Sequence, residues 1–129
     1  MKKEPIDFFK ADYPQWWHLR LEQFPVGWTD LLTEFFRALD SLNSAVSQPK
    51  VWVSVHFERS EVGPWTAYIA PAVRMKDWSA DDALHALTAV EKVNFAMSRT
   101  CEICGVFNGI PRLHPKPERI LCEEHRNVD

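Results

Sequence analysis

The sequence has few cysteines, few glycines and no long hydrophobic run. Only three of its 129 residues are cysteines, and all three lie in the last thirty residues. An odd number of thiols cannot close into a disulfide framework, and a chain of this length does not need one, so metal binding explains them better. Four glycines accompany nine scattered prolines, which excludes a collagen-like or linker-dominated architecture.

A large excess of charge of one sign is also absent. Fifteen lysines and arginines stand against 18 aspartates and glutamates, so the formal net charge is −3. This balance lacks the basic footprint of a general nucleic-acid-binding protein. No stretch approaches the roughly 20 apolar residues of a membrane span, and no apolar run follows Lys2 and Lys3 as in a signal peptide. We therefore expect a cytoplasmic protein with no membrane partner, folded as one domain over residues 1–129.

Two segments show the apolar spacing of amphipathic helices. The first covers residues 29–43, with Thr29 as the expected N-cap and no proline to interrupt it. The second opens at Ser79, where Asp82 completes a pattern similar to a capping box, and it runs to about Ser98. Its expected core-facing side comprises Ala83, Leu87, Val90 and Met97, with Asn94 among them, and Leu84 and Ala86 broaden this side.

Between the two helices the pattern changes to a period of two. From Lys50 to Glu58, apolar residues alternate with larger or more polar ones, and a shorter alternation runs from Trp65 to about Ala70. A short polar turn separates the two runs, which predicts an antiparallel β-hairpin. The expected fold class is α+β, in which the hairpin packs with the two helices and a C-terminal zinc-ribbon-like module follows.

Residues 1–27 are rich in aromatic side chains and interrupted by prolines. Residues 16–23 have room for two helical turns before Phe24–Pro25 ends them. Large aromatic side chains are mostly buried in folded proteins, so we expect this segment to wrap over the core. The alternative is an exposed aromatic patch that contacts a partner.

The strongest motif has the spacing Cys-x2-Cys-x17-Cys-x2-His and consists of Cys101, Cys104, Cys122 and His125. Zinc prefers thiolate and imidazole ligands, and two intervening residues allow one tight turn to direct both side chains at a single ion. Gly105 follows the second thiol, where the chain often needs a positive φ. Residues 99–126 are therefore predicted to bind one structural Zn²⁺ through all four side chains.

Several alternatives to this zinc site remain. His114 could replace His125 as the fourth ligand, although nearby prolines favour an exposed loop around it. Cys101 and Cys104 could form a redox pair instead, but no βαβ unit accompanies them. Iron–sulfur clusters usually take four cysteines. Four ligands in one short module would close the coordination sphere, whereas catalytic zinc keeps one position open for water.

The order of these motifs carries further information. Gly27–Trp28 opens the first helix, the hairpin follows, Cys-x2-Cys-Gly occupies residues 101–105, and Leu-Cys-x2-His occupies residues 121–125. This layout resembles that of short, uncharacterised bacterial and phage-borne proteins, and the likeness covers about residues 24–125. The resemblance implies the same fold and zinc module, and an accessory or mobile-element context.

A closed zinc site without a catalytic constellation favours a non-enzymatic protein that binds another macromolecule, and a protein partner in particular. Trp52 and His56 share the outward face of the first expected strand, and Tyr68 lies on the second. These three residues are the expected interaction surface, unless the N-terminal segment covers them. A homodimer through the unpaired hairpin edges is a further expectation.

Two other classes of function remain as alternatives. A small nucleic-acid-binding regulator could use the zinc module, although the charges there are of both signs. A metal-dependent nuclease would need a second ligand cluster, and His18, His56 and His85 are isolated in the sequence.

Overall fold

The computed structural model describes residues 1–45, 53–59, 65–71, 79–107, 110–112 and 119–125. This part of the chain confirms the α+β class. Its helices are α1 (Lys3–Asp12), α2 (Thr29–Ala45) and α3 (Ala80–Met97). Its strands form two antiparallel pairs, β1 (Val53–Arg59) with β2 (Trp65–Pro71) and β3 (Ile110–Arg112) with β4 (Arg119–Leu121).

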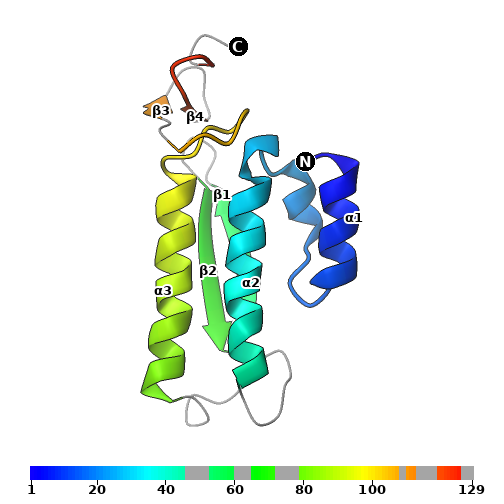
Figure 1. Ribbon diagram of the computed structural model, residues 1–129, viewed down its shortest axis with the longest axis vertical. Coiled ribbons are helices and arrows are strands. Elements are labelled where there is room, and N and C mark those ends of the chain that lie inside the picture. The colour runs from blue at the N-terminus through cyan, green and yellow to red at the C-terminus, as the bar shows by residue number, and fades with distance from the viewer. Residues whose placement is uncertain (46–52, 60–64, 72–78, 108–109, 113–118, 126–129) are drawn as a thin grey trace.

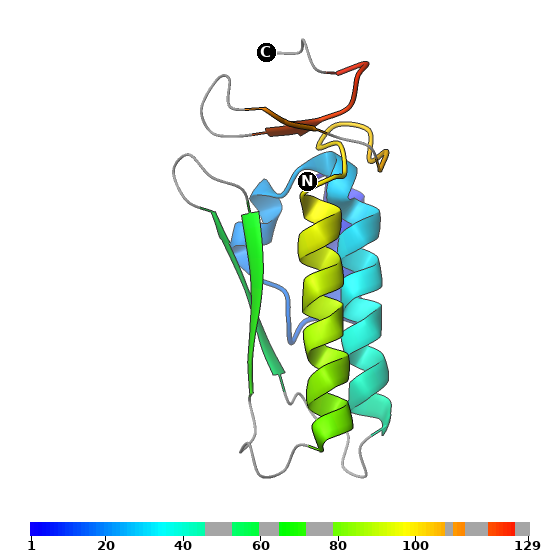
Figure 2. The ribbon, with the colours of Figure 1, turned by 90° about the vertical axis from the view of Figure 1, so that its left-hand side faces the viewer.

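The elements are arranged in two layers. Helices α2 and α3 lie side by side against one face of the β1–β2 hairpin, and α1 lies on the side of α2 opposite α3 (Figure 1). Figure 2 shows the hairpin as one layer and the two long helices as the other, with β3 and β4 beyond one end of both layers. We call the described residues from 99 to 125 the metal module. None of the described helices is long and apolar enough to cross a membrane.

The expected alternation along the first strand is confirmed. Val53 and Phe57 are buried on the inward face, whereas His56 between them is exposed. The antiparallel register places His56 opposite Tyr68 on β2. The described strand begins at residue 53, so the earlier part of the predicted strand, including Trp52, lies outside the described residues.

Helix α3 begins as predicted, but the face that it buries matches the expected one only in part: Ala86 and Met97 are buried, whereas Leu84 is exposed. The Ser79 side chain accepts a hydrogen bond from the Asp82 backbone N–H at 3.0 Å, so the predicted cap is confirmed. Leu87, expected in the core, is 54% exposed. Small side chains allow α3 to pack closely on α2, and the core face is centred on them rather than on the leucine. The buried residues of α3 are Ala86, Ala89, Val93 and Met97.

The N-terminal segment is more regular than predicted. Helix α1 was not expected because Pro5 interrupts the segment, but Pro5 lies in the first helical turn, where a missing N–H removes no hydrogen bond. A 3-10 helix at Leu19–Gln23 replaces the two turns predicted there. Thr29 is not an N-cap, since its hydroxyl donates to the Val26 carbonyl at 3.1 Å and a 3-10 turn precedes it.

The aromatic side chains of this segment form part of the core, as the wrapping interpretation predicted. Four of them are buried, Phe9, Tyr13, Trp16 and Phe24, as is Trp28 directly after the segment. Phe36 of α2 lies among them, with its ring centroid 5.7 Å from that of Phe9 and 5.7 Å from that of Trp16. Burying a side chain of this size stabilises the fold by about 1.5–3 kcal/mol.

Side chains hydrogen-bond to both outer edges of the β1–β2 hairpin. The Trp16 indole Nε1 donates to the Val53 carbonyl at 3.1 Å. On the other edge, the Asn94 side chain accepts from the Ala67 N–H at 2.8 Å and donates to the Ala67 carbonyl at 3.1 Å. These contacts use backbone groups that an added strand would need. Dimerisation through the hairpin edges therefore stays a prediction, with fewer free backbone groups than the sequence suggested.

Candidate metal centre

The four residues of the Cys/His motif come together beyond the end of α3. Their ligand atoms, three Sγ atoms and a histidine ring nitrogen, all lie within 4.8 Å of one another. The first pair lies on the turn that follows α3, and the second pair lies on the turn that follows β4. The structure thus brings together the residues that the spacing selected: Cys101, Cys104, Cys122 and His125.

The turn that carries the first pair is tightly hydrogen-bonded. The Gly105 N–H donates to the Cys101 carbonyl at 3.0 Å, and the Ile103 N–H donates to the Cys101 Sγ at 3.4 Å. Gly105 has a φ of +80°, which confirms the expected need for glycine after the second thiol. These bonds direct the side chains of Cys101 and Cys104 to the same side of the turn.

The second pair approaches the first through its sulfur and nitrogen atoms. The His125 N–H donates to the Cys122 carbonyl at 3.1 Å, which closes the turn. His125 Nδ1 lies 3.1 Å from the Cys122 Sγ and 3.7 Å from the Cys101 Sγ. The Cys104 and Cys122 sulfurs are 3.7 Å apart, and all three cysteines are free thiols. The donor set is therefore three sulfurs and Nδ1 of one imidazole.

The environment of the first thiol favours the thiolate that a metal needs. Burial acts to raise the pKa of Cys101, but hydrogen bonds from the backbone N–H groups of Cys104, Cys122 and Ile103 outweigh it and lower the pKa to about 6. For Cys104, a hydrogen bond from the Val106 N–H acts to lower the pKa, but desolvation and the neighbouring thiols outweigh it and raise the pKa. A cation bound among the sulfurs would offset the repulsion between neighbouring thiolates.

The arrangement can hold a metal ion through four protein ligands. Thiolates and imidazole form the donor set of tetrahedral sites, and both halves of the set lie on short hydrogen-bonded turns. Cys101 and Cys122 are buried, His125 is half-buried and Cys104 is exposed, so one side of the centre faces solvent. His114, the alternative fourth ligand, lies outside the described residues.

Glu102 is a buried acidic residue next to the centre, and the sequence did not indicate it. Its side chain is 6% exposed, its Oε2 accepts from the Ile120 N–H at 2.6 Å, and its Oε1 lies 3.8 Å from the Arg119 Nε. Burial raises the pKa of Glu102, against the Ile120 hydrogen bond and the positive charges of Arg119 and Arg59. Glu102 therefore joins the first ligand turn to β4, just before Cys122.

The expected interaction surface is accessible where it can be described. Tyr68 is 49% exposed, and its cross-strand neighbour His56 is also exposed, so the N-terminal segment does not cover these two side chains. The His56 Nε2 lies 3.4 Å from the Ser54 hydroxyl. Trp52, the third member of this surface, lies outside the described residues.

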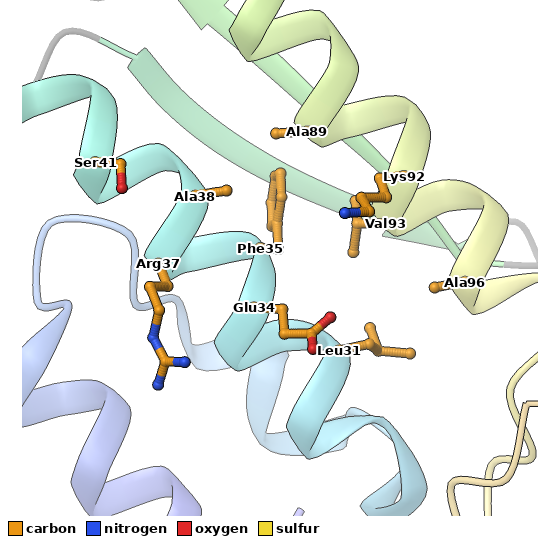
Figure 3. A pocket seen from close by; sticks show the side chains of 10 residues that line it. All are labelled: Leu31, Glu34, Phe35, Arg37, Ala38, Ser41, Ala89, Lys92, Val93 and Ala96. Atoms are coloured by element: carbon orange, nitrogen blue, oxygen red, sulfur yellow. The ribbon is translucent and has the colours of Figure 1, made fainter.

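A groove between α2 and α3 is the other concave feature of interest. It has apolar side chains at its floor, including Phe35, Ala89 and Val93, and charged side chains such as Glu34 and Lys92 at its rim (Figure 3). None of the four candidate ligands lines this groove. The candidate metal centre and the groove are therefore separate features.

Comparisons with known proteins identified no relative of this chain. We compared the chain with protein-family models, with curated proteins and with solved structures, and found no match in any of the three. The features of this chain that bear on function are the geometry of the Cys/His cluster and the exposed surfaces described above.

Proposed function

We propose that this chain is a non-enzymatic protein that is stabilised by one structural zinc ion and binds another protein. The observation that carries the proposal is the convergence of three sulfurs and one imidazole nitrogen within 4.8 Å. Four protein ligands complete a tetrahedron and leave no coordination position for a reacting water. Such a site stabilises a fold rather than activating a substrate.

Zinc is the metal that this donor set favours. Three thiolates disfavour magnesium and calcium, which take oxygen ligands, and an iron–sulfur cluster normally takes four cysteines. We expect protein purified without added metal to contain one zinc ion per chain by elemental analysis. We also expect Co²⁺ in its place to give the strong visible absorption of tetrahedral thiolate coordination.

A pair of histidine variants tests the ligand assignment. His125→Ala should weaken Zn²⁺ binding by at least tenfold, because one of four ligands is lost. His85→Ala is the matched control, since His85 is an exposed residue of α3 outside the cluster. Metal-free protein, or equal affinities for the two variants, would contradict a four-ligand centre.

We place the protein-binding surface on the outward face of the β1–β2 hairpin. Tyr68 presents an exposed aromatic ring there, beside the exposed side chains of His56 and Glu58. Tyrosine is enriched in protein interfaces because its ring is rigid and its hydroxyl forms hydrogen bonds. The opposite face of the hairpin packs on the helices, so the outward face is the one free to bind.

Site-specific crosslinking tests this surface. A photoreactive amino acid at position 68 should capture a defined protein partner, whereas the same group at Leu87, similarly exposed on α3, should not. Capture of the same proteins from both positions would contradict a specific surface. Capture of a second copy of this chain from position 68 would assign the surface to a homodimer instead.

Nucleic-acid binding is the second candidate, and one observation favours it. Phe95 of α3 and Phe107 of the metal module are both 57% exposed, their ring centroids are 5.7 Å apart, and the Arg99 guanidinium lies 6.0 Å from the Phe95 ring centroid. Exposed rings beside an arginine can stack on unpaired bases. Binding to single-stranded RNA or DNA that weakens steeply with salt would favour this candidate, and weak, salt-independent binding would exclude it.

A further inference from the structure

The backbone on both sides of Cys101 is held by two residues of the 3-10 turn just before α2. The Trp28 indole Nε1 donates to the carbonyl of Thr100 at 2.8 Å, in a buried hydrogen bond. The Gly27 N–H donates to the carbonyl of Glu102 at 2.9 Å. The carbonyls immediately before and after the first candidate ligand therefore both accept from the same dipeptide, which is remote from them in the sequence.

The two segments touch backbone to backbone. A Cβ atom at Gly27 would lie 2.3 Å from the Cys101 carbonyl oxygen and 2.8 Å from the Gly105 nitrogen. A Cβ atom at Gly105 would lie 2.8 Å from the Gly27 carbonyl oxygen. Real Cβ atoms do not approach other atoms this closely, so both positions require glycine for the contact to form. The ligand turn is thus packed directly on the turn that begins α2.

Trp28 also connects this contact to the aromatic core. Its side chain is 1% exposed, and its ring lies edge-on to Phe24 with the centroids 5.4 Å apart. Phe24 in turn contacts Phe57 of β1 and Trp65 of β2, at centroid distances of 5.1 and 5.0 Å. The indole is therefore packed in the core, and its N–H bond is directed at the metal module.

We infer that Gly27 and Trp28 are positioning residues of the metal centre, so the affinity for metal depends on the N-terminal half of the chain. This inference rests on the proposed function, in which the four residues bind a metal ion. A ligand whose backbone is already held in the binding geometry loses less conformational entropy when the ion binds. By linkage, a bound ion should in turn stabilise the packing of the Gly27–Trp28 turn on the ligand turn.

Three buried tryptophans of this chain provide a matched test. Trp28→Phe removes the hydrogen bond to Thr100 and keeps a ring in the core. Trp16→Phe removes a similar hydrogen bond, to Val53 on the hairpin edge, away from the metal centre. Trp65→Phe removes no hydrogen bond, because the buried Trp65 Nε1 has no partner among the described residues. The three variants make the same substitution, so they share its packing cost to a first approximation.

The measurement is the dissociation constant for Zn²⁺, obtained by competition with a chromophoric chelator at fixed pH. We expect Trp28→Phe to bind Zn²⁺ about fivefold to tenfold more weakly than the wild type, the effect of losing one buried hydrogen bond. We expect Trp16→Phe to bind it within about twofold of the wild type, and Trp65→Phe, whose ring contacts Phe24, to weaken binding less than Trp28→Phe does. Equal affinities for Trp28→Phe and the wild type, or equal weakening in all three variants, would overturn the inference.

A second variant keeps the test valid if Trp28→Phe fails to fold. Gly27→Ala leaves the indole in place and displaces the ligand turn by the clash with the Cys101 carbonyl. It should weaken Zn²⁺ binding at least as much as Trp28→Phe, and wild-type affinity in a folded Gly27→Ala protein would overturn the inference. A wild-type protein that binds no metal would instead overturn the proposed function, so the two failures are distinguishable.

Discussion

The helical core and the metal module are filled with different kinds of side chain. The interior between the helices and the β1–β2 hairpin consists largely of aromatic rings and aliphatic side chains, with Leu32, Phe36 and Leu39 fully buried. The separate buried cluster of the metal module consists of Cys101, Leu121 and Cys122, with Ile103 packed against it. The core therefore contains the apolar surface that stabilises a fold, and the metal module contains the candidate metal ligands.

This difference predicts that the metal module depends more on a bound metal ion than the core does. A module this short is expected to bury too little apolar surface to offset its conformational entropy, and such small modules usually depend on metals or disulfides. The two regions nevertheless meet closely, at the glycine contact and through Ile120 of β4, which belongs to the core cluster. We therefore expect metal removal and core substitutions to change the stability of the two regions by different amounts.

Removal of the metal should produce the largest difference in stability between the metal module and the core. The free energy of binding a structural zinc ion is about 10 kcal/mol or more, and in a small module it is largely the free energy of folding. We expect a strong chelator to abolish the protection of backbone amides from hydrogen exchange in the metal module, while the amides of α2 and α3 remain protected. Added Zn²⁺ should restore protection, and equal loss of protection in both regions would show that they fold as one unit.

Phe36→Ala should destabilise the core and leave metal binding intact, because it removes a ring at the centre of the aromatic core. A cavity of this kind costs about 3–5 kcal/mol. We expect chemical denaturation to show this loss of unfolding free energy, while the folded variant still binds one metal ion per chain. Phe107→Ala, at a ring that is 57% exposed, serves as the control and should cost less than about 0.5 kcal/mol. A loss of metal stoichiometry in the Phe36 variant would argue against separate interiors.

Gly27→Ala tests the contact between the two regions. The new methyl group would overlap the Cys101 carbonyl oxygen, so one backbone segment must move, at a cost of about 2–3 kcal/mol. We expect denaturation to show this loss and hydrogen exchange to increase at residues 100–105. Val26→Ala changes the neighbouring residue, which is 39% exposed, and should have little effect. Similar losses in both variants would indicate a general weakening of the turn.

The smallest effect should come from the edge of the hairpin, which lies wholly within the core region. Asn94→Ala removes both hydrogen bonds to Ala67, a loss of about 1–2 kcal/mol, and should speed exchange of the Ala67 amide. The affinity for metal should not change. Thr88→Ala is a suitable control, because that hydroxyl donates to the Leu84 carbonyl on an exposed part of the same helix. An unchanged exchange rate at Ala67 would show that Asn94 does not protect the edge.

Local sequence patterns predicted where helices and strands lie better than they predicted which face of each is buried. The start of α3, the alternation along β1 and the positive φ of Gly105 each depend on a few neighbouring residues, and all three expectations are confirmed. The inward placement of Leu87 was wrong, because the face that α3 buries depends on how closely α2 approaches it. Helix α1 was missed because a proline near the start of a segment was taken to interrupt the whole segment.

The sequence predicted the ligands of the candidate metal site but not the contacts that surround them. Spacing alone identified the four residues that the structure brings within 4.8 Å, because two closely spaced ligands on a tight turn form a nearly local structure. Spacing contained no signal for Glu102, whose burial depends on β4 lying beside the first ligand turn. It also gave no reason to connect Trp28 with Thr100, because that hydrogen bond joins segments far apart in the chain.

The amino-acid sequence by itself determined the α+β class, the residues of the Cys/His cluster and the burial tendency of the N-terminal aromatic side chains. These properties follow from side-chain chemistry and from periods of two to four residues. Only the tertiary structure decided which face of α3 is buried and that the Gly27–Trp28 turn supports the ligand turn. Such contacts depend on the relative positions of distant segments, which are set by the packing of the whole core.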